Sequence, residues 1–424
     1  MPFLLRHRNF ALLWFAGLIS MIGDWMLIIA LPVYVYETTG STLATGIMFM
    51  VGRLPSLLLG SVAGVFVDRW DHRRTMIVVN LLLAASLLPL VLVPGTGWLW
   101  IVYVVAFVES SVGQFFGPAE NALLPTLVGK EHLVTANSLN ALNNNLARLL
   151  GPALGGFVAL RLGLGGVVIL DVGTFLLAAL LIGLIRLAPA TARFVTPEQA
   201  ATIEAPAGIM RFLHEWRAGL RLVRREPLVS LLFTMTALMA IGEGVLAVLF
   251  VPFVTEVLRA EALELGWLMS AQAVGGLLGG AIIARLGNRL SPAHILGPSA
   301  VIFGLIDLAI FNYPALFPGI TIALALFILV GLPAAALGAS FSTLLQNSVD
   351  ESYLGRIFGA HNTTFALLTL IGMALASLLG DLLGIVPVIN IQGVAPVVAG
   401  LLAMRLLPRI QRRNNETLLS SEPS

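Results

Sequence analysis

Residues 60 to 74 read GSVAGVFVDRWDHRR, and this stretch separates two long apolar segments of the chain. The apolar helix expected before it ends at Asp68 and Arg69, and a short basic loop follows. The next apolar run begins near residue 75. A compact charged turn between two apolar segments of this length is typical of membrane proteins that cross the bilayer several times.

The composition of the whole chain supports this interpretation. Of its 424 residues, 58% are hydrophobic and 11% are charged, so water could not solvate the remaining apolar surface. A bilayer core of about 30 Å needs about 20 residues of helix. We expect an all-α membrane protein without a separate catalytic domain, therefore not an enzyme, whose twelve transmembrane helices cover residues 10–36, 45–67, 75–93, 98–116, 137–160, 165–186, 228–255, 264–284, 293–311, 314–338, 357–380 and 385–407.

The distribution of basic residues predicts the orientation in the membrane. Lysine and arginine lie mainly in the loops that share a side with the N-terminus, and such loops are usually cytoplasmic. We therefore expect a multi-pass protein of the cell (inner) membrane with both termini in the cytoplasm. The basic residues are scattered over short loops and form no basic groove, so we expect no nucleic-acid partner.

The sequence also limits the chemistry that the chain can carry out. Cysteine is absent, which excludes disulfide bonds, thiolate metal sites and cysteine nucleophiles. The phosphate-binding pattern G-x-x-x-x-G-K-[ST] is absent as well, so no nucleotide site of that type is expected. We expect no cofactor and no metal.

The chain repeats at an offset of about 220 residues. The segment GDWMLIIALPVYVYE at 23–37 corresponds to GEGVLAVLFVPFVTE at 242–256, and LLPTLVGKEHL from Leu123 corresponds to LLQNSVDESYL from Leu344. Matches in the same order at a nearly constant offset indicate two six-helix bundles in parallel repeat. We expect these bundles at residues 1–190 and 228–424.

A cytoplasmic linker is expected between the bundles, at residues 191–227. Within it, residues 209–225 place apolar and basic side chains on opposite sides of a helix, the pattern of a helix lying on a membrane surface. This helix is interpreted as a structural hinge, with a regulatory site as the alternative.

The stretch at residues 60–74 resembles the loop between the second and third helices of major facilitator superfamily transporters, G-x-x-x-D-R-x-G-R-[RK]. The residues that fall on this pattern are Gly64, Asp68, Arg69 and Arg73, whereas Asp71 and His72 depart from it. The resemblance implies that Asp68 meets the start of the eleventh helix near Arg356, where free N–H groups and the helix dipole favour an anion. Such a contact would form a conformational switch on the cytoplasmic side, and Arg69 and Arg73 could equally be topology signals.

Three further segments are similar to the branch of this superfamily that contains bacterial macrolide and enterobactin exporters. They are the segments from Phe115 and from Leu344 and the sequence GPALGG at 151–156. The glycine–proline motif is associated with antiporters in the superfamily. It would bend the fifth helix and let its backbone approach a neighbouring helix. The alternative is an ordinary packing motif of transmembrane helices. Its residues are Gly151, Pro152, Gly155 and Gly156. The family also implies a monomer.

Five charged residues fall inside the expected helices, where each costs roughly 2.5 to 3.5 kcal/mol on insertion scales and needs a partner, water or a function. They are Asp24, Glu109, Glu243, Arg53 and Arg148. The acids are candidates for binding a proton or the substrate, with a structural hydrogen bond as the alternative for Asp24. The arginines are expected to be counter-ions of the acids rather than binders of an anionic substrate.

The five charged residues are expected to line a polar translocation path through the protein, and other ionisable residues are expected away from this path. By the predicted spans, the supporting helices carry acids only near their outer ends, at Asp171 and Asp307, and all six histidines lie in or beside cytoplasmic loops.

These observations predict a secondary transporter that exports an amphipathic small molecule such as a drug, a macrolide or a siderophore. We expect proton antiport by rocker-switch alternating access, so that the partners are the substrate, protons and the lipid bilayer. One alternative is a facilitator or a lipid or metabolite transporter of the same fold that is not coupled to protons. The other is a polytopic membrane enzyme or receptor that does not transport.

Overall fold

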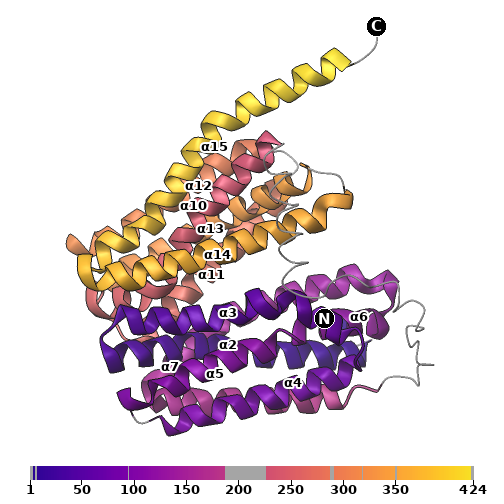
Figure 1. Ribbon diagram of the computed structural model, residues 1–424, viewed down its shortest axis with the longest axis vertical. Coiled ribbons are helices and arrows are strands. Elements are labelled where there is room, and N and C mark those ends of the chain that lie inside the picture. The colour runs from indigo at the N-terminus through magenta and orange to yellow at the C-terminus, as the bar shows by residue number, and fades with distance from the viewer. Residues whose placement is uncertain are drawn as a thin grey trace. The chain divides into compact units, whose positions relative to one another are not determined.

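The computed structural model of the chain describes residues 3–4, 7–93, 95–186, 226–286, 291–317, 319–348 and 351–421 (Figure 1). In these ranges all regular elements are helices. Eleven of the described helices are long and apolar enough to cross a membrane. The expected amphipathic helix at 209–225 and most of the linker lie outside the described residues.

The first half of the chain begins with α2 (Arg8–Thr39), α3 (Thr42–Val67) and α4 (His72–Leu87), the last of which continues as the 3-10 turn η1 (Leu88–Leu92). After η2 (Thr96–Trp98), α5 (Leu99–Gly113) and α6 (Phe116–Val128) follow closely, and η3 (Lys130–His132) leads into α7 (Leu133–Gly183). Within α7, Gly163 has a left-handed backbone with φ 65°. This kink divides α7 into two parts of membrane-spanning length.

The second half contains α10 (Pro227–Pro252), which continues as the π-helical turn η4 (Phe253–Val257), then α11 (Ala262–Leu286) and α12 (Pro292–Asn312). The turn η6 (Tyr313–Ala315) leads to α13 (Ile320–Gln346), α14 (Glu351–Leu383) and α15 (Ile385–Ser421). With α7 counted as two spans, the described helices match the twelve expected ones, so the predicted all-α membrane fold is confirmed.

The helix boundaries depart from the expectation in two places. Residues 117–128 were expected in a loop, but they form most of α6, because Leu123 and Leu124 turn inward and are only 2% exposed. The helix α14 begins at Glu351 rather than near residue 357. Both differences extend helices at the cytoplasmic side of the predicted topology.

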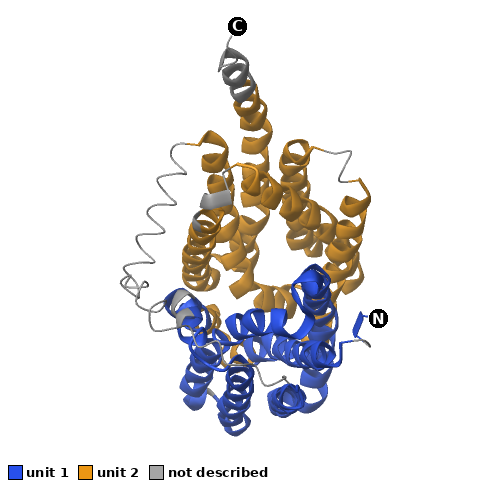
Figure 2. Cartoon of the chain, turned by 90° about the vertical axis from the view of Figure 1, so that its right-hand side faces the viewer, with its two compact units in different colours: residues 1–34, 51–214 blue, residues 35–50, 215–424 orange. Residues whose placement is uncertain are grey.

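The chain forms two compact units, coloured separately in Figure 2. The N-terminal unit contains residues 1–34 and 51–214, and the C-terminal unit contains residues 35–50 and 215–424. The end of α2 and the start of α3 thus belong to the C-terminal unit. The predicted division into bundles at 1–190 and 228–424 with a linker at 191–227 stays a prediction. The two compact units differ from this division in segment 35–50, which belongs to the C-terminal unit although the prediction places it in the N-terminal bundle.

Each unit has an apolar core that holds its helices in place. In the N-terminal unit the core gathers around Phe10, Leu13 and Met76, which are at most 1% exposed. In the C-terminal unit it gathers around Leu232 and Leu345, which are fully buried.

The sequence repeat reappears in the way helices pack. A Cβ atom on Gly151 of α7 would lie 3.1 Å from the carbonyl oxygen of Ile22 on α2. At the repeat positions, a Cβ atom on Gly372 of α14 would overlap the carbonyl oxygen of Ile241 on α10. Because only glycine permits such backbone contact, the same helix pair is packed in the same way in both units.

Candidate functional site

Three carboxylates form a cluster in the N-terminal unit. Asp24 on α2 and Glu109 on α5 are partly buried, and Asp171 on α7 is fully buried. The Asp24 and Glu109 carboxyl groups both lie near enough to the Asp171 carboxyl group to interact with it electrostatically. The sequence predicted Asp24 and Glu109 as candidate site residues, and Asp171 joins them.

The position of Asp171 corrects the expectation from the sequence. It was expected near the outer end of a supporting helix, apart from the polar path, but its side chain packs directly on Gly23, the residue before Asp24. A Cβ atom at Gly23 would overlap the Asp171 carboxyl group and the hydroxyl of Thr174. The rotation of α7 about its axis, which residue spacing alone does not fix, turns Asp171 inward toward α2.

The C-terminal unit holds a related group of polar residues at the repeat positions. Glu243 on α10 is exposed, and Gln392 on α15 packs on Gly242, where a Cβ atom would lie 2.6 Å from Gln392 Oε1. Asp307 on α12 is 5% exposed and accepts a hydrogen bond from Gln392 Nε2 at 3.3 Å. Glu243 lies near enough to interact with Asp307 electrostatically, so Asp307 belongs to a polar group together with Gln392.

The two intramembrane arginines are both exposed, Arg53 on α3 and Arg148 on α7. Their expected role as counter-ions of the acids stays a prediction.

Two asparagines of α7 join this helix to its neighbours. Asn143 is buried and its Nδ2 donates to the carbonyl of Trp14 on α2 at 2.8 Å, and Asn140 Nδ2 donates to Glu120 Oε1 at 3.1 Å. The glycine–proline motif lies next in α7, and a Cβ atom on Gly155 would lie 2.6 Å from Met26 Cα. This segment therefore fixes the distance between α7 and α2, the helix that carries Asp24.

The loop between α3 and α4 is held by Asp71, which departs from the sequence pattern, and by Arg73, which falls on it. Asp71 caps α4 by accepting a hydrogen bond from Arg74 N at 2.7 Å, which explains why an acid replaces the usual glycine of the pattern. Arg73 donates from Nε to the Ile182 carbonyl at 3.1 Å and from Nη2 to the Gly183 carbonyl, so it caps the end of α7.

The other residues of the predicted switch give less information. Asp68 and Arg69 are exposed after the end of α3, and Gly64 lies inside α3. A contact of Asp68 with Arg356 would join the two units and stays a prediction.

Segment 35–50, which contains the turn between α2 and α3, makes polar contacts inside the C-terminal unit. Asp381, near the end of α14, accepts hydrogen bonds on Oδ1 from Thr42 N at 3.2 Å and from Thr42 Oγ1 at 2.9 Å. Tyr36 donates its hydroxyl to Glu256 Oε1. Because Thr42 is the first residue of α3, Asp381 acts as a capping group supplied by another helix. Sequence reasoning missed this contact, because a threonine at a helix start is a capping signal but its acceptor lies 339 positions away in the chain.

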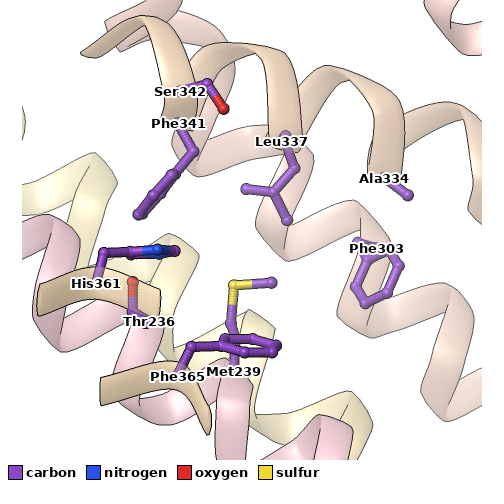
Figure 3. A pocket seen from close by; sticks show the side chains of 10 residues that line it. Thr236, Met239, Phe303, Ala334, Leu337, Phe341, Ser342, His361 and Phe365 are labelled. Atoms are coloured by element: carbon purple, nitrogen blue, oxygen red, sulfur yellow. The ribbon is translucent and has the colours of Figure 1, made fainter. Parts of the chain in front are cut away.

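A cavity of about 300 Å³ lies inside the C-terminal unit, and Figure 3 shows most of its lining side chains. Aromatic, aliphatic and thioether groups dominate the lining. The residues are Thr236 and Met239 of α10, Phe303 of α12, Ala334, Leu337, Gly338, Phe341 and Ser342 of α13, and His361 and Phe365 of α14.

His361 lies among aromatic rings in this cavity. Its ring centroid is 5.0 Å from that of Phe341 and 6.4 Å from that of Phe365 (Figure 3). The expectation that this histidine lies beside a cytoplasmic loop stays a prediction. Because α14 begins at Glu351, His361 lies almost three turns inside the helix.

Comparisons with known proteins agree with the fold and the length of the chain. The multidrug efflux pump Tap of Mycolicibacterium fortuitum is 29% identical, and the alignment covers 97% of this chain and 98% of Tap. Macrolide efflux protein A of Streptococcus pyogenes is 25% identical over 89% of this chain and 90% of its own length. A bacterial homologue of the iron transporter ferroportin, solved in its inward-facing state, has a similar fold, with a TM-score of 0.73, 16% identity and coverage of 94% of this chain and 98% of that one.

The sequence also matches, over residues 2–423, the family described as transmembrane secretion effector. A match of this extent leaves almost no part of the chain outside the family. The chain is a multi-pass membrane transporter of the major facilitator type and belongs to the transmembrane secretion effector family.

Proposed function

We propose that this transporter exports an amphipathic small molecule, such as a drug, a macrolide or a siderophore, in exchange for protons. The observation that carries the proposal is the cluster of Asp24, Glu109 and Asp171 within one bundle of a transporter whose relatives include efflux pumps. Carboxylates in a poorly hydrated site bind and release protons as water access and neighbouring charges change. Such a cluster is suited to coupling proton entry to substrate exit.

The energy available from protons is sufficient for export. One proton moving inward releases about 2.3 kcal/mol for each 100 mV of membrane potential, and each pH unit adds about 1.4 kcal/mol. A single proton per cycle can therefore support a substrate gradient of roughly two orders of magnitude without nucleotide hydrolysis.

The cavity of the C-terminal unit supports the amphipathic substrate class. A volume of about 300 Å³ is at the small end of ligand pockets, so it would hold an aromatic or aliphatic part of a larger molecule. Phe341 and Phe365 offer ring faces, and His361 and Thr236 offer hydrogen-bonding groups.

Alternating access requires contacts that break and form again during the cycle. Thr42 at the start of α3 and Asp381 near the end of α14 form two hydrogen bonds. This contact can break and form again during the cycle, because it involves few polar groups and short segments. The proposed orientation, with both termini in the cytoplasm of the inner membrane, places this contact at the outer surface. The transporter is proposed to act as a monomer.

The experiment that tests proton antiport uses the purified protein in proteoliposomes loaded with a pH-sensitive dye. Addition of candidate compounds, for example ethidium or erythromycin, is expected to release protons with the wild-type protein, and Asp24→Asn is expected to abolish this release. Glu131→Gln, which removes an exposed acid of η3, is the matched control and should behave as wild type.

The same vesicles separate the alternative functions. Counterflow that is unchanged by an imposed pH gradient would replace antiport by facilitated transport. Absence of any counterflow for a broad set of amphipathic compounds would refute export of this substrate class.

A further inference from the structure

Asp171 is the most deeply buried acid of the carboxylate cluster. Its exposed fraction is 0%, and its Oδ1 accepts a hydrogen bond from Thr174 Oγ1 at 3.0 Å. The other oxygen, Oδ2, is buried without a hydrogen-bond partner among the described residues. An anion in this position would lose its hydration and gain a single hydroxyl donor, whereas a neutral carboxyl group tolerates the missing partner far better.

Two further carboxyl groups lie near Asp171. Asp24 on α2 and Glu109 on α5 act on its carboxyl group, and the absence of a side chain at Gly23 lets that group lie against the α2 backbone beside Asp24. The helix α4 also packs on α7. Its contacting cation is Arg73, which binds the carbonyls of Ile182 and Gly183. Since Ile182 is eleven residues beyond Asp171, this cation lies about 16 Å further along the helix.

The repeat shows which kind of side chain this position accepts. Gly23 of α2 corresponds to Gly242 of α10, and Asp171 corresponds to Gln392 at an offset of 221 residues. Gln392 packs on Gly242 as Asp171 packs on Gly23. Thus the C-terminal unit fills the same place with a neutral amide, which is similar in shape and polarity to a protonated carboxylic acid.

We propose that Asp171 is a further proton-binding residue of the transport cycle, which receives its proton from Asp24 and returns it to Asp24. This inference rests on the proposed proton antiport. In the transfer one O–H bond of Asp24 breaks and one O–H bond forms at Oδ2 of Asp171, which leaves the charge on the less buried Asp24. Reversal of the transfer re-forms the O–H bond of Asp24, and Asp24 then releases this proton to a water molecule on the inner side.

The first test detects the proton directly and does not depend on transport. Infrared difference spectra of the purified protein in lipid, recorded between acidic and alkaline pH in H₂O and D₂O, show the C=O stretch of protonated carboxyl groups. We expect a deuterium-sensitive band that is absent in Asp171→Asn and present in Asp307→Asn, the matched buried acid of the other unit. We also expect the pH dependence of this band to change in Asp24→Asn. A band that persists in Asp171→Asn overturns the assignment.

The second test separates a transport role from a purely structural one. Dissipation of a pH gradient by exchange for ethidium is expected to fall about a hundredfold in Asp171→Asn, the usual range for loss of a proton-transfer group, while ethidium counterflow persists. Unchanged proton-to-substrate coupling in a folded Asp171→Asn protein overturns the proposal. Absence of proton movement in the wild-type protein instead refutes the proposed antiport.

A second variant keeps the test decisive if Asp171→Asn does not fold. Thr174→Val removes the hydroxyl donor to Oδ1 but leaves the acid in place. A shift of the infrared band in Thr174→Val supports the assignment, and an unshifted band overturns it.

Discussion

The contact between α3 and α14 provides the sharpest test of the conformational mechanism, through the substitution Asp381→Ala. Asp381 Oδ1 accepts from both Thr42 N and Thr42 Oγ1, whose distances are 3.2 and 2.9 Å. Removal of the carboxylate leaves the first N–H group of α3 without this acceptor. It also removes an anion from the positive end of that helix dipole.

The magnitude follows from these two losses. An N-terminal capping group contributes about 1 kcal/mol, and a charge at a helix terminus contributes roughly 0.3 to 1 kcal/mol. Asp381 is itself exposed, so we take the total as about 1.5 to 2 kcal/mol rather than the sum of two charge-assisted bonds. A free-energy change of about 1.4 kcal/mol changes an equilibrium constant tenfold. The fraction of molecules in which this contact is broken should therefore rise about 10- to 30-fold.

The assay uses the absence of cysteine from the natural chain. Thr45, one turn into α3, is fully buried, and Thr45→Cys introduces a single thiol that a maleimide reaches only when segment 35–50 leaves its place. The rate of labelling in nanodiscs should rise by the same factor of about 10 to 30 in Asp381→Ala, because the open fraction limits the reaction.

Thr39→Val is the matched control. Thr39 belongs to the same segment, but its hydroxyl donates to Val35 and accepts from Ser41 N. Neither hydrogen bond involves Asp381, so loss of this hydroxyl should change the labelling rate far less than Asp381→Ala does. Equal labelling of Thr45→Cys with and without Asp381→Ala, in proteins of equal thermal stability, would show that this contact does not hold the segment closed.

Three further predictions concern other parts of the chain. Asp68→Asn should lower transport without affecting membrane insertion, and it should slow maleimide labelling of the same thiol because loss of the predicted inner contact favours the opposite conformation. Gly155→Leu should lower the melting temperature and the yield of folded protein, since a Cβ atom there would lie 2.6 Å from Met26 Cα and overpacking costs roughly 1 to 3 kcal/mol or more. Arg73→Gln should destabilise the N-terminal unit by about 1 to 3 kcal/mol, measured by thermal unfolding, because the Ile182 carbonyl loses a charged donor.

The sequence predicted the fold well because the signals for membrane helices are long and local. Apolar runs of about 20 residues and glycine turns define each helix separately. The eleven described helices of membrane-spanning length agree with the twelve expected spans, because the kink at Gly163 divides α7 into two of them. The boundaries failed where a helix continued past the apolar core. The chain from 116 to 128 and the first turns of α14 carry polar residues, which hydropathy assigns to loops.

The candidate site was predicted only in part because its geometry depends on helix rotation. Asp24 and Glu109 were recognised from their cost in a membrane, which requires no knowledge of neighbours. Asp171 was assigned to a different role because its position along the helix was known but the direction of its side chain was not. The contact of Thr42 with Asp381 joins residues 339 positions apart, and no local pattern fixes such a pairing.

Comparison of the two halves supplies the information that a single helix lacks. Gly23 and Gly242 occupy equivalent places, and in both units the side chain packed on them is polar and buried. If that place had only a packing role, an apolar residue would satisfy it at lower cost, since a buried polar group needs partners. An acid packs on Gly23 and an amide packs on Gly242, and of these two side chains only the acid can bind a proton. The difference between Asp171 and Gln392 therefore puts a group that can bind a proton at this position only in the N-terminal unit, whereas Glu243 and Asp307 of the C-terminal unit lie at other positions.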